Sequence, residues 1–386
     1  MSAGPWPCRL SPSHEADPSN ADPMPFPSDP PSGPRTAMTS LIPSHTRVAL
    51  VLAGGNALGA YQAGVYEALH DAGIAPEWIV GTSVGAVNAA IIAGNASADR
   101  LARLRDIWRP EAVDTFGTPW WDISFDGWRR TGEVMATMIG GRQGVFAPLG
   151  TALADRDAPA LYDTMPLART LARLVDFDRL NEGPVRYTAQ AMALDTGAEV
   201  AFDSRNVRMT PDHIRASCAM PPAFPPVAIE GERFVDGGLS ANLPLDPVLS
   251  QPGEGPLLCI SVDLLPLAGA PALTIGGMIA RAQDLLFAAQ SRRTLARWQA
   301  QYAVDPDLAA ASVTLFQLHY ADQQAEVAGK ALDFSPRSVR ARWDAGLRDG
   351  RALVARLADG GIALGACGLR LITRADASAA TVGDVP

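Results

Sequence analysis

The sequence is poor in lysine and has no basic stretch interleaved with aromatic residues. Lys330 is the only lysine in 386 residues, and the formal net charge is −9. An acidic protein gains nothing from its overall field when it meets nucleic acid or anionic lipid. The composition therefore argues against a nucleic-acid-binding protein.

Cysteine is also scarce. The four cysteines lie far apart, and none belongs to a C-x-x-C motif: Cys8, Cys218, Cys259 and Cys367. This spacing provides neither a zinc site nor a dense disulfide framework. We expect a reduced, cytoplasmic setting and no metal or cofactor.

Long hydrophobic runs are missing as well. No apolar stretch approaches the roughly 18–20 residues that span a bilayer. The N-terminal residues lack the basic start and apolar core of a secretory signal. We therefore expect any contact with a membrane to be peripheral. Residues 1–45 are rich in Pro, Ser and Asp without an apolar period, which predicts a disordered arm, and residues 374–386 are expected to be a loose tail.

What is present begins with alternating strands and helices. Residues 47–52 read RVALVL, an apolar strand, and residues 60–72 are expected to form a helix. A second strand at 78–80 precedes a second helix at 84–92. Strand–helix–strand–helix predicts an α/β fold with a mainly parallel sheet and crossover helices.

The regular pattern is lost between residues 111 and 163, where aromatic residues and methionines lie among Gly and Pro. One interpretation is an irregular insertion that packs its own aromatic side chains. The other is an apolar lid, or an acyl-chain surface, over a site.

The most informative motif is Gly81-Thr82-Ser83-Val84-Gly85, which lies between the second predicted strand and its helix. A Ser on such a sharp turn projects its hydroxyl from the backbone, and the glycines Gly81 and Gly85 let neighbouring chain pass close by. An ordinary tight turn has the same letters, so the motif alone does not establish a nucleophile.

A glycine loop, GGNALG at residues 54–59, follows the first strand and opens the first helix. It is not a dinucleotide-binding G-x-G-x-x-G, because position 56 is Asn. It is not a P-loop either, because Ala60-Tyr61 follows Gly59 in place of Lys-Ser/Thr. What remains is an anion cradle at a helix N-terminus, suited to the oxyanion of acyl transfer.

A serine nucleophile needs a base. The chain has five histidines: His14, His45, His70, His213 and His319. His319 is the best candidate for a Ser–His–Asp triad because it ends a predicted strand. The alternative is that His319 has a purely structural role. A desolvated carboxylate can also serve, since desolvation raises its pKa. Asp236 in Asp236-Gly237-Gly238 is such a candidate, and an ordinary turn is its alternative.

Taken together, the three motifs resemble those of the patatin-like phospholipases, with the same order and similar spacing over residues 47–265. The resemblance implies a three-layer α/β/α fold and a catalytic dyad of Ser83 and Asp236. It also implies an oxyanion hole at Gly54, Gly55 and Asn56, with Gly59, Gly237 and Gly238 as supporting glycines. The implied substrate is a lipid or fatty-acyl ester, and no metal or cofactor is implied.

The rest of the chain resembles one bacterial branch of that family, which carries a C-terminal extension with a DFS and an RW-x-AG pattern. Asp333-Phe334-Ser335 and Arg342-Trp343-Asp344-Ala345-Gly346 fit it. We therefore predict a catalytic domain at 46–265 and a mostly helical extension at 266–373.

Two positions depart from the family pattern: Asn56 replaces the third loop glycine, and Leu58 replaces a common Arg or Lys. The loss of that cation favours an acyl ester hydrolase over a phospholipase in particular. A Ser–His–Asp esterase and a non-catalytic lipid-binding or regulatory protein that retains the fold remain open. A transacylase would use the same residues.

Overall fold

The structure is a computed structural model, and it describes residues 41–109, 126–149, 160–269, 274–321, 323 and 326–373. The chain divides into two units, and the described helices and strands all belong to the second, Ser40–Pro386. Residues 1–40 of the predicted disordered arm, the loose tail and parts of the predicted insertion lie outside the described residues. The sequence predicts an arm that reaches residue 45, but Ile42 is buried in the hydrophobic core, so the ordered part begins earlier than the prediction.

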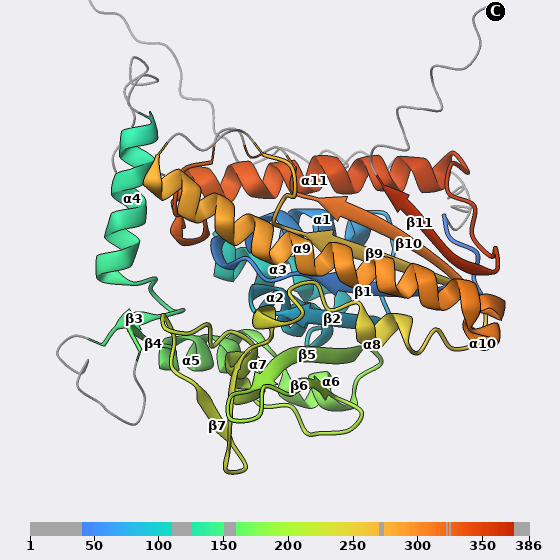
Figure 1. Cartoon of the computed structure of the whole chain (residues 1–386), viewed down its shortest axis with the longest axis horizontal. Helices are drawn as coiled ribbons and strands as arrows, with labels where there is room; N and C mark the ends of the chain where they lie inside the picture. Colours follow the sequence, from blue (N-terminus) through green and yellow to red (C-terminus); the bar gives the residue numbers. More distant parts are fainter. Residues whose placement is uncertain are drawn as a thin grey trace, which may run out of the picture. The chain divides into compact units, whose positions relative to one another are not determined.

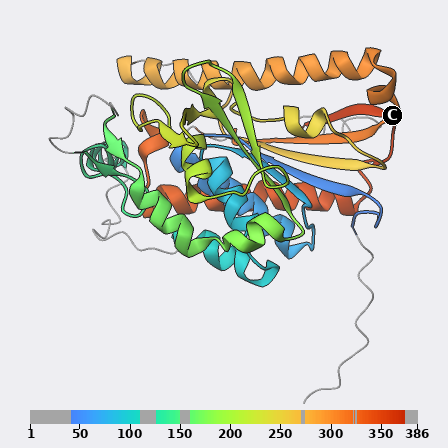
Figure 2. The ribbon, with the colours of Figure 1, turned by 90° about the horizontal axis from the view of Figure 1, so that it is seen from below.

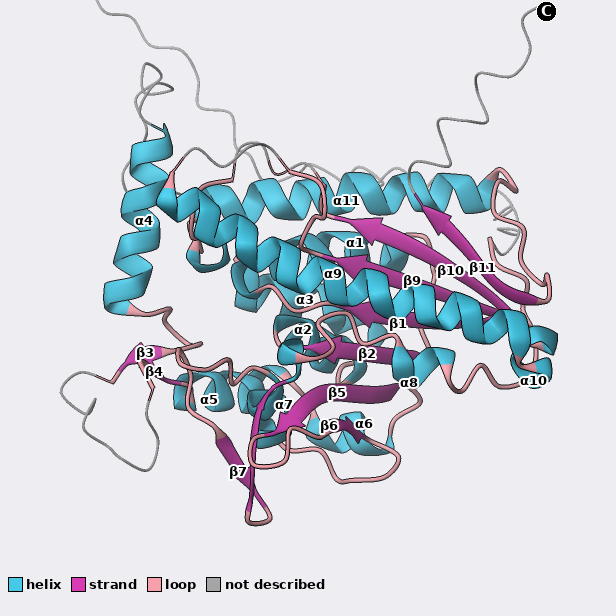
Figure 3. Ribbon diagram, viewed as in Figure 1, coloured by secondary structure: helices cyan, strands magenta, loops and turns pink. Residues whose placement is uncertain are grey.

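The centre of this unit is a sheet in the order β11-β10-β9-β1-β2-β5-β8-β7, with β6 paired to β5 (Figure 1; Figure 3). The pairs from β11 to β5 are parallel, and those among β5, β6, β7 and β8 are antiparallel. Its strands are β1 (Arg47–Leu52), β2 (Trp78–Thr82), β5 (Arg186–Ala193), β6 (Glu199–Asp203), β7 (Val227–Ile229), β8 (Glu232–Asp236), β9 (Leu257–Asp263), β10 (Ser312–His319) and β11 (Gly368–Thr373). A separate two-stranded sheet pairs β3 (Ala147–Pro148) with β4 (Tyr162–Asp163).

Along the central strands, alternate side chains lie in two separate hydrophobic cores, one on each face of the sheet. Leu50 and Leu52 of β1 belong to the core beneath one layer of helices, whereas Ala49 and Val51 belong to the core beneath α9 (Ile275–Val304). Figure 2 shows α9 along one face of the sheet and α11 on the other. This is the predicted three-layer α/β/α arrangement, and the predicted fold class is confirmed.

The other helices follow the chain order. They are α1 (Ala60–Asp71), α2 (Val84–Ala93), α3 (Ser97–Trp108), α4 (Asp126–Gly140), α5 (Met165–Leu174), α6 (Phe177–Glu182), α7 (Pro211–Ser217), α8 (Asp246–Leu249), α10 (Pro306–Ala310) and α11 (Pro336–Ala358). The Ser335 side chain caps α11 by accepting a hydrogen bond from the Ser338 N–H, as a Ser before an N-terminal Pro predicts. Among the described residues, no helix is both long enough and apolar enough to cross a membrane.

Two features differ from the sequence prediction. The 15-residue helix α4 lies in the segment that the sequence predicts to be irregular. Its buried side chain Val134 and its exposed Met135, Met138 and Ile139 follow helical spacing, but Gly132 and Gly140 weaken that signal. The second feature is β11, a strand that extends the sheet beyond β10 at the end of the segment predicted to be mostly helical.

Candidate active site

Ser83 lies at the sharp turn between β2 and α2, with φ 55° and ψ −126°. A positive φ is uncommon for a non-glycine residue and marks stored backbone strain. The flanking glycines make the turn sterically feasible. A Cβ at Gly81 would overlap the Gly85 carbonyl group, and one at Gly85 would overlap the Leu52 carbonyl oxygen. The geometry is that of a nucleophile elbow.

The backbone of this elbow is fixed by α7. The Ser83 N–H donates a hydrogen bond to Oγ of Ser217, with an N···O distance of 2.9 Å. Ser217 is fully buried at the C-terminal end of α7. The sequence offered no motif that would single it out, because only the tertiary fold brings α7 beneath the elbow.

Asp236 ends β8 and is 1% exposed. Its Oδ1 accepts a hydrogen bond of 2.7 Å from the Gly238 N–H, and its Oδ2 has no hydrogen-bond partner among the described residues. Burial raises the pKa of Asp236 to about 7, and the Gly238 N–H and the Ser83 hydroxyl oppose that rise. Because Oδ2 has no donor in the described ranges, this oxygen of the carboxylate is available to accept a proton.

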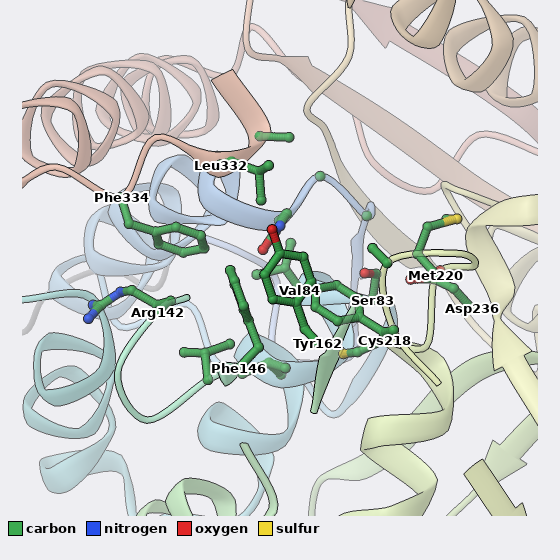
Figure 4. Close-up of a pocket in the computed structure, with 18 of the residues that line it drawn as sticks. Ser83, Val84, Arg142, Phe146, Tyr162, Cys218, Met220, Asp236, Leu332 and Phe334 are labelled. Atoms are coloured by element: carbon green, nitrogen blue, oxygen red, sulfur yellow. The ribbon is translucent and has the colours of Figure 1, made fainter. Parts of the chain in front are cut away.

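Figure 4 shows Ser83 and Asp236 at the same end of a pocket. The pocket has a volume of about 330 Å³, and Gly54, Gly55 and Asn56 line it beside the two candidate catalytic residues. Its wall is mainly apolar and aromatic, from α2, α3, α4, α5, α9 and the loops between them: Val84, Val87, Ile107, Trp108, Met138, Val145, Phe146, Leu161, Tyr162, Leu167, Met220, Phe224, Leu265, Phe287, Leu332 and Phe334.

The glycine loop packs directly against the nucleophile, since a Cβ on Gly54 would lie 3.2 Å from the Ser83 Cβ. The Gly54 N–H is engaged, donating to the Asn242 carbonyl oxygen at 3.0 Å. Within the described part of the chain, the N–H groups of Gly55 and Asn56 have no protein acceptor. Two adjacent N–H groups without an acceptor, on residues that line the pocket, are what an oxyanion hole requires.

Asn56 has φ 49°, a conformation that Asn tolerates better than most residues. Leu58 is fully buried in the core and contributes no group to the pocket. Gly59 is needed for close packing, because a Cβ there would come within 2.5 Å of Val84 and 2.8 Å of Trp108.

The supporting glycines after Asp236 are also closely packed. A Cβ at Gly237 would lie 2.5 Å from the Gln190 carbonyl oxygen, and one at Gly238 would lie 3.0 Å from Asp236 Oδ1. Asn242, which the sequence reasoning missed, lies just beyond them. Its side chain donates to the Gly54 carbonyl oxygen at 3.3 Å and links the two motifs.

Few charged groups line this pocket. Lys330 donates to Asp284 Oδ2 at 2.7 Å, so the two opposite charges on the pocket wall compensate each other. In Figure 4 Arg142 lies at the opposite side from Ser83 and Asp236. Cys218 is nearer the elbow, and burial raises the pKa of its thiol well above the usual value, so it remains protonated.

His319 is not brought to this site. It ends β10, which is separated from β2 by β9 and β1. Three inter-strand steps amount to about 14 Å. None of the described histidines lines the pocket. Nor do His, Cys, Asp and Glu side chains form a group of three suited to a metal ion in the described ranges.

The family described as "Patatin-like phospholipase" matches residues 50–249. Curated relatives include the uncharacterized NTE family protein MT2641 of Mycobacterium tuberculosis CDC 1551, 27% identical over 240 residues (60% of this chain, 34% of the relative). Another is Rv1063c of strain H37Rv, 27% identical over 230 residues (59% and 52%). The chain thus spans between a third and about half of the length of these relatives.

Among solved structures, VipD of Legionella pneumophila matches with a TM-score of 0.39 and 15% identity, over 82% of this chain and 67% of that one. ExoU of Pseudomonas aeruginosa, in complex with SpcU, matches with a TM-score of 0.28 and 16% identity, over 69% and 57%. The assignment rests on the family match, which covers more than half of the chain. The protein belongs to the patatin-like phospholipase family.

Proposed function

We propose that the protein is a serine acyl hydrolase that cleaves lipid carboxylic esters through a dyad of Ser83 and Asp236. One observation carries the proposal. Ser83, on a strained turn that lines the pocket, and the fully buried carboxylate of Asp236 lie at the same end of an apolar pocket. A carboxylate whose pKa lies near 7 is a far better proton acceptor than an ordinary Asp.

The reaction proceeds in two halves. Asp236 takes the proton of the Ser83 hydroxyl while Oγ attacks the ester carbonyl carbon. The N–H groups of Gly55 and Asn56 hold the resulting oxyanion. When it collapses, the C–O bond to the alcohol breaks, the alcohol takes the proton from Asp236, and Ser83 remains acylated.

Water completes the cycle. Asp236 removes a proton from a water molecule that attacks the acyl-enzyme carbonyl. The second tetrahedral intermediate collapses, the Ser83 Oγ leaves and recovers the proton, and the carboxylic acid is released. Another acceptor alcohol would make the same chemistry a transacylation.

The wall of the pocket supports an acyl chain as the group bound beside Ser83. Phe146 packs edge-to-face against Tyr162 and at a tilt against Phe224, with ring centroids 4.9 and 5.3 Å from its own. Such a wall stabilises hydrocarbon by burial and offers few partners to a polar substituent. Since Leu58 provides no cation, the proposal does not depend on an anionic headgroup.

Intact-mass analysis after incubation with a fluorophosphonate tests the dyad. The wild-type protein should gain one adduct, which Ser83→Ala and Asp236→Asn should both lose or form at least 100-fold more slowly. Folding of each variant is checked by circular dichroism. An adduct that persists in Ser83→Ala would refute Ser83 as nucleophile. Wild-type labelling in Asp236→Asn would remove Asp236 from the mechanism, and an unlabelled, folded wild type would favour a lipid-binding role.

We also propose that the protein meets its substrate by peripheral contact with a bilayer through the N-terminal half of α9. Ile275, Ile279 and Leu286 are 83%, 67% and 67% exposed on the side facing away from the protein. The only charged side chains between residues 275 and 290 are Arg281 and Asp284. Both are turned inward, to the Pro266 carbonyl oxygen and to Lys330.

This apolar face is continuous with the proposed active site. Phe287 of the same helix lines the pocket. The start of α9 and the helix α4 both flank residues 328–330, and α4 exposes Met138 and Ile139 (Figure 1). An apolar helix face next to an acyl-binding pocket fits an interfacial position at a lipid surface.

Co-sedimentation with vesicles of phosphatidylcholine and phosphatidylglycerol tests this contact. Leu286→Glu combined with Ile279→Glu should lower vesicle binding at least 10-fold without lowering turnover of a soluble short-chain ester. Val304→Glu is the matched control, because Val304 is 81% exposed at the other end of the same helix. Equal binding by the double variant and the wild type would refute the proposed surface.

A further inference from the structure

We infer that Arg342, from the C-terminal segment, is a positioning residue that holds the oxyanion loop in its working conformation. This inference rests on the proposed function. It assigns a role to the RW-x-AG pattern, which the family resemblance leaves without one.

Arg342 is completely buried on α11, and its guanidinium group has all five N–H donors engaged. Nε and Nη2 donate to the two carboxylate oxygens of Glu326 at 2.8 and 2.7 Å. Nη2 also reaches the Lys330 carbonyl oxygen at 3.0 Å, and Nη1 reaches that of Asp333 at 2.7 Å. The fifth N–H, also on Nη1, donates to the Ala57 carbonyl oxygen at 3.1 Å, outside the C-terminal segment.

The contact with Ala57 acts on the oxyanion donors through planar peptide groups. In a trans peptide the C=O and the following N–H point in opposite directions. Holding the Ala57 carbonyl therefore directs the Leu58 N–H the other way, where it donates to the Gly55 carbonyl oxygen at 3.1 Å. That bond fixes the Gly55–Asn56 peptide and leaves the Asn56 N–H, one of the two proposed oxyanion donors, directed away from the Gly55 carbonyl.

Other loop carbonyls are held by the catalytic domain itself. Gln62 donates to the Ala53 carbonyl oxygen at 2.7 Å, and Asn88 donates to that of Gly59 at 3.0 Å. Asn242 holds the Gly54 carbonyl. Arg342 supplies the corresponding contact for the middle of the loop, and it comes from the distant C-terminal segment.

Close helix packing keeps Arg342 at a fixed distance from the loop. α11 crosses α1, which begins directly after Gly59. A Cβ at Gly64 would overlap the Trp343 carbonyl oxygen, and one at Gly346 would overlap that of Tyr61. Since the backbones touch on both sides of the crossing, α11 cannot move without moving the start of α1.

The buried ionic cluster balances its own charge. Arg130 of α4 donates to Glu326 at 2.8 Å and to Asp333 at 3.2 Å, so two arginines face two carboxylates. Burial alone would raise the pKa of both acids. At Glu326 the two arginines lower the pKa, and at Asp333 a hydrogen bond from Ser338 and the charge of Arg342 lower it. Arg342 therefore stays charged and immobile, as a positioning group must.

Steady-state kinetics with a short-chain aryl ester distinguish positioning from general stability. In Arg342→Met, kcat should fall 10- to 100-fold with KM changed less than 3-fold, because an oxyanion donor acts in the transition state. The pH midpoint set by Asp236 should stay in place, and the fluorophosphonate labelling rate should fall in parallel. Arg130→Met, which removes an arginine from the same cluster, should lose similar thermal stability and retain kcat within 3-fold.

Equal loss of kcat in Arg130→Met, or wild-type kcat in a folded Arg342→Met, would overturn the inference. If Arg342→Met does not fold, Arg342→Lys provides the same comparison. If neither folds, hydrogen exchange of the wild type in low denaturant decides: the loop 54–59 should open together with the start of α11, and independent opening would overturn the inference. A wild type that neither labels nor turns over ester would instead refute the proposed function, and this inference with it.

Discussion

The Oγ atom of Ser217 accepts a hydrogen bond from the main-chain N–H of Ser83, at an N···O distance of 2.9 Å. Both residues lie at the ends of elements, Ser83 between β2 and α2, and Ser217 at the end of α7. The bond connects the strained turn at Ser83 to α7, a helix that is not adjacent to this turn in the sequence. It satisfies an N–H at the start of α2 that has no partner within the helix.

Ser217→Ala should destabilise the protein by about 1–3 kcal/mol, because the Ser83 N–H then loses its buried acceptor. Ester turnover should fall roughly 10- to 100-fold as the elbow relaxes. Urea unfolding and kcat measure the two effects. Ser261→Ala is the matched control: Ser261 is fully buried in β9 and its hydroxyl has no hydrogen-bond partner in the part of the chain that the structure describes, so its removal should be neutral or stabilising. Similar losses in both variants would contradict this role for Ser217.

The pH dependence of kcat/KM should report Asp236. The deprotonated carboxylate is the active form, so kcat/KM should rise with pH and level off above a midpoint of about 7. A full pH–rate profile with a substrate that does not titrate tests this. A midpoint near 4, the ordinary range of Asp, would show that Asp236 is not the buried base of the reaction.

Asp236→Asn should make the protein more stable while it abolishes turnover. The pKa of Asp236 is 3.8 when exposed and about 7 in the fold, so its stabilising contribution is complete below pH 3.8 and is lost as pH rises to 7. This loss is on the order of 4 kcal/mol. Asn avoids it and keeps an oxygen for the Gly238 N–H. Thermal unfolding should therefore show a higher Tm for the variant at pH 8 and a smaller difference at pH 5; a lower Tm at pH 8 would contradict the pKa.

Gly85→Ala should disrupt the elbow, because the added Cβ would overlap the Leu52 carbonyl oxygen of β1. We expect loss of labelling and destabilisation by more than about 3 kcal/mol, typical of overpacking against backbone. Gly132→Ala is the control: Gly132 lies within α4 and has open space around it, so Ala should stabilise by up to about 1 kcal/mol. Unaltered labelling in Gly85→Ala would refute the close approach.

His319→Ala should retain at least half of the wild-type kcat. Its strand lies about 14 Å from β2, too far for a direct proton transfer to Ser83. The His319 main-chain oxygen, which a substitution leaves in place, is the atom that accepts from Tyr61. A loss of activity by 100-fold or more in a folded His319→Ala would restore the Ser–His–Asp alternative.

Local sequence was sufficient for much of this molecule. The apolar strand ending at Leu52, the turn carrying Ser83 and the cap at Ser335 each depend on residues within a few positions of one another, so their patterns predicted the elements and the family. The continuous helix α4, which contains Gly132, shows the limit of such patterns, because the low helix propensity of a glycine is a weak signal where packing decides.

The tertiary structure alone decided what surrounds those motifs. Burial, which depends on the whole fold, sets the pKa of Asp236, and the strand order removes His319 from the site. The Gly54 N–H donates to the Asn242 carbonyl oxygen, and the Arg342 guanidinium donates to the carbonyl oxygen of Ala57, 285 positions away in the sequence. Spacing along the chain cannot predict such contacts, because they form only when distant helices pack against the same sheet and bring their polar groups within hydrogen-bonding distance.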